Sequence, residues 1–328
     1  MASLVEKVTR AALRLVAAQS PEKAGELAFF LFARTRSTKP QGEKEREALA
    51  RAQARMAESE TIRLLIPGSV IATHVFRPAS ATTGGQRVLL VHGYRSRSDH
   101  MVTLADALVA AGHTVVCLDL PGHGASSGRT LHLGKAVEAI DAAWRQHGPF
   151  DAYVGHSFGG PSVLAAAVGA ILHVPKRTPD RIVTIAAPSN LADVFRWAAE
   201  LMGLAPATQA AFERQVLRAT GRPLSEFRVD RLLHDVRIPM LVIHAEDDKE
   251  VAFSNAEAIA AAGPHVRLMK ANGFGHRRIV AAAAVTEAVV DFLAGDTRKA
   301  EIVDLPLPSA GEITKLPASE SGRSRRLA

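Results

Sequence analysis

The residues of this chain best suited to chemistry are Gly155-His156-Ser157-Phe158-Gly159. They follow a short apolar run, 152–154, and precede a segment of small residues, 161–172, that predicts a helix. A serine flanked in this way at a strand-to-helix junction is typical of the sharp turn that lifts a nucleophilic hydroxyl out of a sheet. The glycines fit because the neighbouring backbone leaves no room there for a Cβ atom. Ser157 is therefore the candidate nucleophile.

A serine hydroxyl attacks poorly at neutral pH and needs two helpers. A base must lie within hydrogen-bond reach of it, and a third group must orient that base. The chain has 13 histidines, so a histidine near a loop carries little information by itself. The position of each candidate relative to the predicted strands must decide which one acts.

From residue 87 onward, strand-like runs alternate with helical runs. The predicted strands are 87–91, 114–118, 151–155, 181–186, 239–244 and 265–270, and the predicted helices are about 99–111, 134–147, 158–172, 252–262 and 276–293. This alternation predicts an α/β fold with a doubly wound, mostly parallel sheet that has helices on both faces. Segments 61–66 and 70–76 predict an antiparallel hairpin at its edge.

Two more motifs follow the first two strands of this series. His92-Gly93-Tyr94 comes directly after 87–91, and Asp119-Leu120-Pro121-Gly122-His123-Gly124-Ala125-Ser126-Ser127-Gly128 comes after 114–118. With the serine motif, they stand in the order and approximate spacing of the α/β-hydrolase superfamily. The chain resembles this superfamily over about residues 62–293, in particular its esterase and lipase-like serine hydrolases. The resemblance implies the fold and the nucleophile, and it says much less about the substrate.

In that family the acid follows the nucleophile along the chain, and the histidine comes last. The resemblance implies that Asp248 is the acid, in the loop after the strand 239–244. It implies that His276 is the base, in a Gly-x-Gly-His turn after the last strand. Glu246 and Asp247 remain alternatives for the acid if the strand ends at a different residue. Asp193 occupies the position that some hydrolases use instead.

The family architecture also implies an oxyanion hole made of two backbone N–H groups. They belong to Tyr94, in the turn after the first central strand, and to Phe158, which follows the nucleophile. We interpret the motif residues His92, His123 and His156 as holding loops by side-chain hydrogen bonds. The remaining candidates of the same type are interpreted as structural, namely His113, His244 and His265.

About 50 residues without a clear strand separate the sixth strand from the next one, with helices predicted at 191–202 and 207–220. An insertion at this point resembles the helical cap that covers the active site in many α/β-hydrolases, here at about 189–235. Its apolar residues either line an acyl pocket or pack the cap onto the body, and both interpretations stay open; they include Phe195, Trp197, Leu201, Met202, Leu204 and Phe212. The predicted division is a helical extension at 1–60, the hydrolase domain at 61–295 and a disordered tail at 296–328.

The extension is predicted to be helical, with Ser20 as a helix N-cap and Pro21 as the first helical residue. In its first helix, Leu4, Val8, Ala11, Ala12 and Leu15 recur at helical spacing. These helices could lie on a membrane surface, pack on the core or pack on another subunit. No run approaches the ~18 to 20 apolar residues that span a bilayer, and the N-terminus lacks the apolar stretch of a signal peptide. The expected location is cytoplasmic, with membrane association left open.

Composition narrows the class of protein further. The 328 residues, 47% of them hydrophobic, are enough for one large core. The single cysteine, Cys117, excludes an intrachain disulfide and a CxxC site, and its place in an apolar run predicts a buried thiol. The formal charge of +7 is dispersed apart from the cluster 323–326, so we expect no nucleic-acid partner. Nothing calls for a metal or an organic cofactor.

Three hypotheses about function follow. The first is a serine esterase that forms an acyl-enzyme on Ser157 from a small-molecule ester or acyl substrate. The second keeps the same three residues for thioester hydrolysis, acyl transfer, amide cleavage or perhydrolysis. The third is a non-catalytic binding protein on the same fold, which a complete Ser, Asp and His in the family's order disfavours. The oligomeric state does not follow from the sequence.

Overall fold

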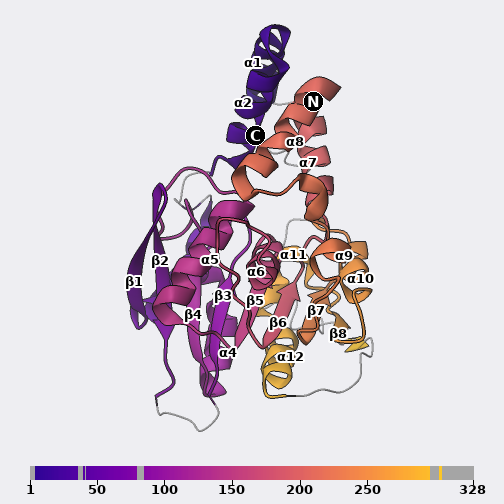
Figure 1. The fold of residues 1–328 in the computed structure, drawn as a ribbon. Coiled ribbons are helices and arrows are strands. Elements are labelled where there is room, and N and C mark those ends of the chain that lie inside the picture. The colour runs from indigo at the N-terminus through magenta and orange to yellow at the C-terminus, as the bar shows by residue number, and fades with distance from the viewer. Residues whose placement is uncertain (1–3, 36–39, 41, 80–84, 296–302, 305–328) are drawn as a thin grey trace.

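The computed structural model describes the chain except for residues 1–3, 36–39, 41, 80–84, 296–302 and 305–328. In the part described, nine strands form one sheet in the order β1-β2-β4-β3-β5-β6-β7-β8-β9 (Figure 1). The strands are β1 Glu60–Ile66, β2 Ser69–Phe76, β3 Arg87–Val91, β4 Thr114–Asp119, β5 Ala152–His156, β6 Arg181–Ile185, β7 Met240–His244, β8 Val266–Lys270 and β9 Val303–Asp304. Strand β2 pairs antiparallel with β1 and β4, and the other pairs are parallel. The predicted mostly parallel α/β sheet with an antiparallel edge is confirmed.

Helices cover both faces of the sheet because the central strands are apolar on both sides. Leu89 and Val91 of β3 belong to one buried layer, with α5 Leu133–His147, α6 Gly159–Val168 and α10 Ser254–Ala260. Val88 and Leu90 belong to the other, with α4 Val102–Ala110 and α12 Ala283–Leu293. Side chains of successive strand residues point to opposite faces, so one short strand serves both layers.

The predicted strands agree with the observed strands to within one residue at either end, whereas the last predicted helix does not survive as one element. It is divided into α11 Gly275–Arg278, the 3-10 turn η3 Ile279–Ala281 and α12. The break lies at Ala282, whose backbone is extended, with φ −71° and ψ 130°. Helix α6 also ends earlier than predicted, because Gly169 adopts a left-handed conformation with φ 70° and caps it.

Four helical elements occupy the insertion between β6 and β7: α7 Leu191–Met202, α8 Pro206–Thr220, η2 Leu224–Glu226 and α9 Val229–Leu232. Helices α1 Leu4–Gln19 and α2 Pro21–Ala33, from the start of the chain, pack beside α7 and α8 (Figure 1). Ser20 caps α2 by accepting a hydrogen bond from the backbone N–H of Lys23, as predicted. We call α1, α2, α7 and α8 together the helical tier. It joins segments that are about 180 residues apart in the sequence.

Aromatic side chains fill the interface inside the helical tier. Phe195 of α7 stacks on Phe212 of α8 with ring centroids 4.6 Å apart. Phe32 of α2 contacts both, at 5.0 Å and 5.6 Å, and Phe29 lies at 6.3 Å from each. Phe195 and Phe212 are buried, so of the two interpretations of the insertion's apolar residues, packing applies to these two.

Close backbone approach and surface ion pairs complete the contact between α2 and α8. A Cβ added to Gly25 would lie 2.5 Å from the Cβ of Ala211, so only glycine fits at this crossing. Glu22 pairs with Arg214 and Arg218. These charged side chains are 38% to 56% exposed, and pairs of this kind contribute little. The apolar packing therefore holds the two helices together.

Helix α3 Glu43–Ala57 packs against the 3-10 turn η1 Ser98–Met101, which leads into α4. Cys117 is fully buried, and burial raises the pKa of its thiol. The predicted tail 296–328 lies outside the described residues, apart from β9, which pairs with Met269 and Lys270 of β8. None of the helices in the described part of the chain is both long and apolar enough to cross a bilayer.

Candidate active site

Ser157 lies in the tight turn between β5 and α6, with a left-handed backbone at φ 51°. Its N–H donates to the carbonyl oxygen of Ile185 at 2.9 Å, which fastens the turn to β6. A Cβ on Gly155 would lie 2.5 Å from the backbone of Gly159, and one on Gly159 would overlap the carbonyl oxygen of Val91. Both flanking glycines are therefore required by close backbone packing, as the sequence predicts.

The structure brings the three predicted residues Ser157, Asp248 and His276 into one hydrogen-bonded series. Nε2 of His276 lies 2.9 Å from Oγ of Ser157, and Nδ1 lies 2.8 Å from Oδ2 of Asp248. A carboxylate can only accept, so Nδ1 carries the proton and Nε2 accepts from the serine hydroxyl. Ser157 is half-buried, while the side chain of Asp248 is fully buried. The hydroxyl can thus meet a substrate while the carboxylate stays away from water.

The surroundings of Asp248 keep it ionised. Burial on its own would raise the pKa of this carboxyl, but hydrogen bonds from His244, His276 and the backbone outweigh burial and hold the pKa well below its usual range. Oδ1 accepts from the backbone N–H groups of Glu250 and Val251 at 2.8 Å and 2.9 Å. Because Oδ1 accepts from these two N–H groups, Oδ2 is the oxygen that accepts from Nδ1 of His276.

The other acids considered from the sequence have different partners. Glu246 pairs with a lysine of β8 at 2.9 Å. Asp247 accepts at 2.9 Å from the backbone N–H of a glycine in the histidine loop. Asp193 pairs with an arginine of its own helix at 2.9 Å. Among the predicted candidates, the structure places Asp248 against His276.

The loop after β3 passes directly beside the serine. A Cβ on Gly93 would lie 2.8 Å from Cβ of Ser157, which is why glycine precedes Tyr94 here. Phe158 stands at the start of α6, where helix N–H groups point toward the site. The hydroxyl of Tyr94 donates to the carbonyl oxygen of Arg34 at 2.9 Å. Both positions are consistent with backbone oxyanion donors, which stay a prediction.

The motif histidines hold the loops around the site. His92 donates from Nδ1 to the carbonyl oxygen of Gly93 at 2.7 Å, and its Nε2 accepts from the N–H of Leu120 at 3.0 Å. His123 accepts at Nε2 from the N–H of Arg95 at 3.1 Å. A nitrogen that faces an N–H donor cannot itself carry a proton, so both rings must be neutral. His156 donates to the carbonyl oxygen of His276 at 2.8 Å.

These neutral histidines predict that the fold weakens in mild acid. Burial lowers the pKa of His92 to about 3 and that of His156 to about 4. In the unfolded chain histidine is protonated below about pH 6.5, whereas these buried histidines stay neutral in the folded chain. The unfolded state therefore binds more protons. The free energy of unfolding should therefore fall as the pH falls, by about 2 kcal/mol per histidine between pH 7 and pH 5. Urea denaturation at pH 7, 6 and 5 measures this.

A matched pair of variants separates these histidines from the rest of the chain. His156→Gln keeps a side-chain donor but removes the titrating group, so the pH dependence of the free energy of unfolding should become shallower. His234 is exposed, and His234→Gln should leave that dependence unchanged. A free energy of unfolding that does not change from pH 7 to pH 5 in the unmodified chain would contradict the prediction.

His244 has a closer relation to the site than the sequence indicates. The sequence indicates a structural residue, and its side chain is fully buried at the end of β7. Its Nε2 lies 2.9 Å from the carbonyl oxygen of Val251 and 3.3 Å from Oδ2 of Asp248. A polar residue four positions before the acid, at the end of an otherwise apolar strand, is the sequence signal that marks it.

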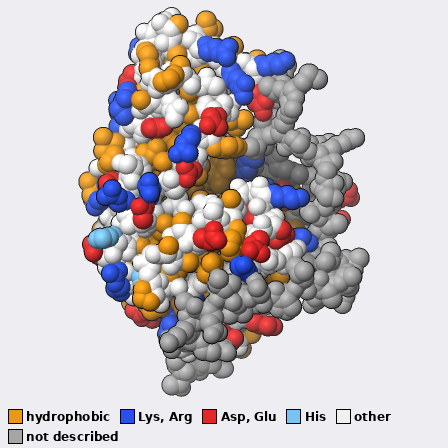
Figure 2. Space-filling view, turned by 90° about the vertical axis from the view of Figure 1, so that its right-hand side faces the viewer, with side chains coloured by type: hydrophobic (Ala, Val, Ile, Leu, Met, Phe, Trp, Pro, Cys, Tyr) orange, Lys and Arg blue, Asp and Glu red, His pale blue; other side chains and the backbone are white. Residues whose placement is uncertain are grey.

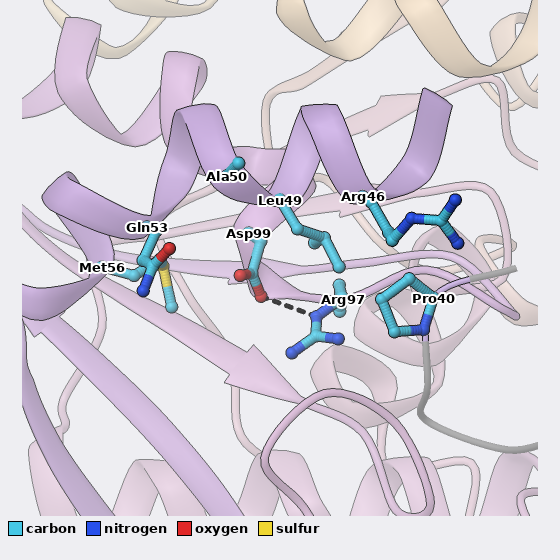
Figure 3. A pocket seen from close by; sticks show the side chains of 8 residues that line it. All are labelled: Pro40, Arg46, Leu49, Ala50, Gln53, Met56, Arg97 and Asp99. Carbon is cyan, nitrogen blue, oxygen red and sulfur yellow. Dashed lines mark hydrogen bonds and ion pairs between the residues drawn. The ribbon is translucent and has the colours of Figure 1, made fainter. Parts of the chain in front are cut away.

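The surface of the described part of the chain has concave regions. The face in Figure 2 is hollowed at mid-height, and hydrophobic side chains are visible inside the hollow. A cavity of about 300 Å³ lies between α3 and the segment before α4. It is lined by Pro40, Arg46, Leu49, Ala50, Gln53, Met56, Arg97 and Asp99 (Figure 3). Arg97 is ion-paired with Asp99 at 2.7 Å, and Ser157 does not line this cavity.

Comparison with known proteins agrees with this geometry. The model of the alpha/beta hydrolase family matches residues 88–289, which contain the serine turn, the acid loop and the histidine loop. This chain belongs to the alpha/beta hydrolase family. The predicted superfamily is thereby confirmed.

The individual proteins that resemble this chain share only part of its sequence. A dihydrolipoyllysine-residue acetyltransferase component of the acetoin cleaving system of Cupriavidus necator is 36% identical over 106 residues, which are 31% of this chain and only 26% of that protein. A pimeloyl-[acyl-carrier protein] methyl ester esterase of Xanthomonas campestris is 28% identical over 247 residues, which are 64% of this chain and 96% of that protein. The crystal structure of an esterase from Rhodococcus sp. ECU1013 matches 72% of this chain and 98% of its own, with a TM-score of 0.51 and 19% identity, which shows a common fold.

Proposed function

We propose that this hydrolase cleaves carboxylic esters through an acyl-enzyme intermediate on Ser157. The observation that carries the proposal is the hydrogen-bonded series from Oγ of Ser157 through His276 to Asp248. It combines a reachable nucleophile, a base in the correct tautomer and a buried carboxylate. Esterases among the related proteins support ester chemistry.

The geometry suggests how each group acts. As Oγ of Ser157 attacks the ester carbonyl, Nε2 of His276 takes its proton, and Asp248 stabilises the resulting imidazolium. The backbone N–H groups of Tyr94 and Phe158 bind the negative oxygen of the tetrahedral intermediate. His276 then gives the proton to the leaving alcohol. A water molecule, activated by the same nitrogen, releases the acid and restores the hydroxyl.

The substrate we propose is uncharged near the reacting carbonyl and apolar beyond it. Phe158 is half-buried beside the nucleophile, and its ring lies 6.5 Å from that of Tyr94. In this proposal the insertion acts as a cap, and α2 is part of it because its aromatic residues fill the cap's interior.

The test is a series of p-nitrophenyl esters with acyl chains of increasing length. Each methylene buried from water contributes about 0.8 kcal/mol, so kcat/KM should rise about fourfold per CH₂ and then fall when the pocket is full. Met202 is half-buried at the end of α7, and Met202→Ala should shift the preferred length. Leu65→Ala, at an exposed position on β1, is the control and should not.

The same assay distinguishes the alternatives. Faster cleavage of a matched thioester or amide would assign the three residues to a different acyl substrate, and transfer to an added alcohol would indicate an acyltransferase. A flat chain-length profile in both variants would show that the insertion only covers the core. Absence of turnover together with absence of labelling by a fluorophosphonate would favour a binding protein and overturn the proposal.

A further inference from the structure

Exposed hydrophobic side chains are concentrated on the helical tier. In the part of the chain that the structure describes, the exposed large hydrophobic residues are Val8, Leu15, Phe30, Leu65, Leu172, Trp197 and Leu217. Five of these seven belong to α1, α2, α7 and α8. Single exposed apolar residues are normal on a protein surface, but a concentration on one part of the molecule marks an interaction surface.

Helix α1 carries the most regular part of this surface. Val8 and Leu15 are 60% and 72% exposed, and they are separated by two helical turns. Ala11, Ala12 and Ala18 are exposed and continue the same side of the helix. The opposite side is used inside the tier, where Leu13 is buried. The outward side of α1 is therefore an apolar stripe that the described residues do not cover.

Positive charge lies along one edge of the stripe. Lys7 and Arg14 are exposed, and their places on the helix are beside Ala18 and Ala11. The whole chain has a formal charge of +7. A helix that separates an apolar face from cationic residues, without being very apolar overall, is typical of segments that lie in the plane of a membrane interface.

The charges also select between two kinds of partner. A second copy of this chain that covered the stripe with its own α1 in antiparallel orientation, by twofold symmetry, would bring Lys7 of one copy near Arg14 of the other. Like charges in such a contact repel each other, and the net charge adds to the repulsion. A bilayer surface that contains acidic lipids accepts both the apolar stripe and the cations beside it.

We propose that the helical tier docks on the surface of an anionic lipid bilayer, with the Val8–Leu15 stripe of α1 in the interface and Lys7 and Arg14 among the headgroups. On the proposed function, in which the insertion and α2 form a cap, this docking places the cap at the membrane, where esters with long acyl chains are found. Binding to lipid does not depend on the proposed ester chemistry, so either conclusion can fail without the other.

The experiment is co-sedimentation of the full chain with vesicles at fixed ionic strength. One vesicle is pure phosphatidylcholine, and the other contains phosphatidylglycerol as about a third of its lipid. Binding should be stronger to the anionic vesicle and should weaken as salt is added. Val8→Glu combined with Leu15→Glu should lower the partition coefficient at least tenfold. Lys7→Gln combined with Arg14→Gln should lower it only on the anionic vesicle, by about fivefold per cation.

Leu65→Glu is the matched control, because Leu65 is 79% exposed on β1, away from the tier. It should bind like the unmodified chain, and all variants should hydrolyse a short soluble ester equally. Equal sedimentation of every variant, or no binding to either vesicle, would overturn the proposal. So would light scattering that shows a dimer in the unmodified chain and a monomer after Val8→Glu and Leu15→Glu, since the stripe would then serve a second copy.

Discussion

Replacing Ser157 by alanine is expected to lower kcat for ester hydrolysis by about 10³-fold or more, with the fold unchanged. The loss is large because the nucleophile and its base act as a unit, and removing either leaves only binding and oxyanion stabilisation. Alanine keeps the Cβ that the turn already accommodates at φ 51°, so folding should be unaffected. Steady-state kinetics with circular dichroism and a thermal melt of both proteins measure the two parts of this prediction.

Covalent labelling independently tests the assignment of Ser157 as the nucleophile. A fluorophosphonate should modify the chain once, at Ser157, and Ser157→Ala should not be modified. Ser126 is buried, with its hydroxyl donating to the carbonyl oxygen of Asp119 at 2.6 Å. The hydroxyl oxygen of Ser127 accepts from the N–H of Val70. Stoichiometric labelling at Ser126 or Ser127 would mean that the nucleophile has been misplaced.

Asp248→Asn should remove nearly as much activity, with a loss in kcat of about 10⁴-fold. The two backbone N–H groups on Oδ1 fix how an amide would sit. Its oxygen must take the place of Oδ1, so its NH₂ group would face Nδ1 of His276. Nδ1 would then have to accept, and the proton would move to Nε2. A protonated Nε2 cannot take the proton of Ser157.

Asp247→Asn is the matched control for this substitution. Asp247 accepts a single hydrogen bond from the N–H of Gly273, and an amide oxygen can accept that bond equally well. The effect on kcat should therefore be less than about threefold, in keeping with a surface hydrogen bond of low net value. Equal and mild losses for both substitutions would show that the acid lies elsewhere, and Asp193 would be replaced next.

The sheet could be predicted from the sequence because each strand is a short apolar run between strong turn signals. The serine turn can also be predicted from local sequence, because the glycines that its close packing requires, Gly155 and Gly159, each lie two residues from Ser157. Asp248 and His276 needed more than local pattern, because neighbouring acids and 13 histidines compete. The resemblance to a family supplied the order of residues, and the structure then placed both beside Ser157.

The parts that could not be predicted depend on contacts between distant segments. Nothing near Phe29 or Phe32 indicates that these rings meet Phe195 and Phe212, about 180 residues later. The break at Ala282 lies in a run of alanines, which carries no glycine or proline to mark it. The contact between His244 and Asp248 could not be predicted either, because an apolar strand indicates only that its last residue is buried.

The requirement for glycine at position 25 has a consequence for chimaeras made between this protein and its relatives. Because Ala211 occupies the space that a Cβ at position 25 would need, α2 and α8 fit each other as a matched pair. A chimaera that imports the insertion of another hydrolase would remove the surface of α8 on which α2 packs. It would also remove the ion pair between Glu22 and Arg214. The unit of exchange in this chain is thus residues 20–34 together with 189–235, two stretches of gene that must be transplanted at once.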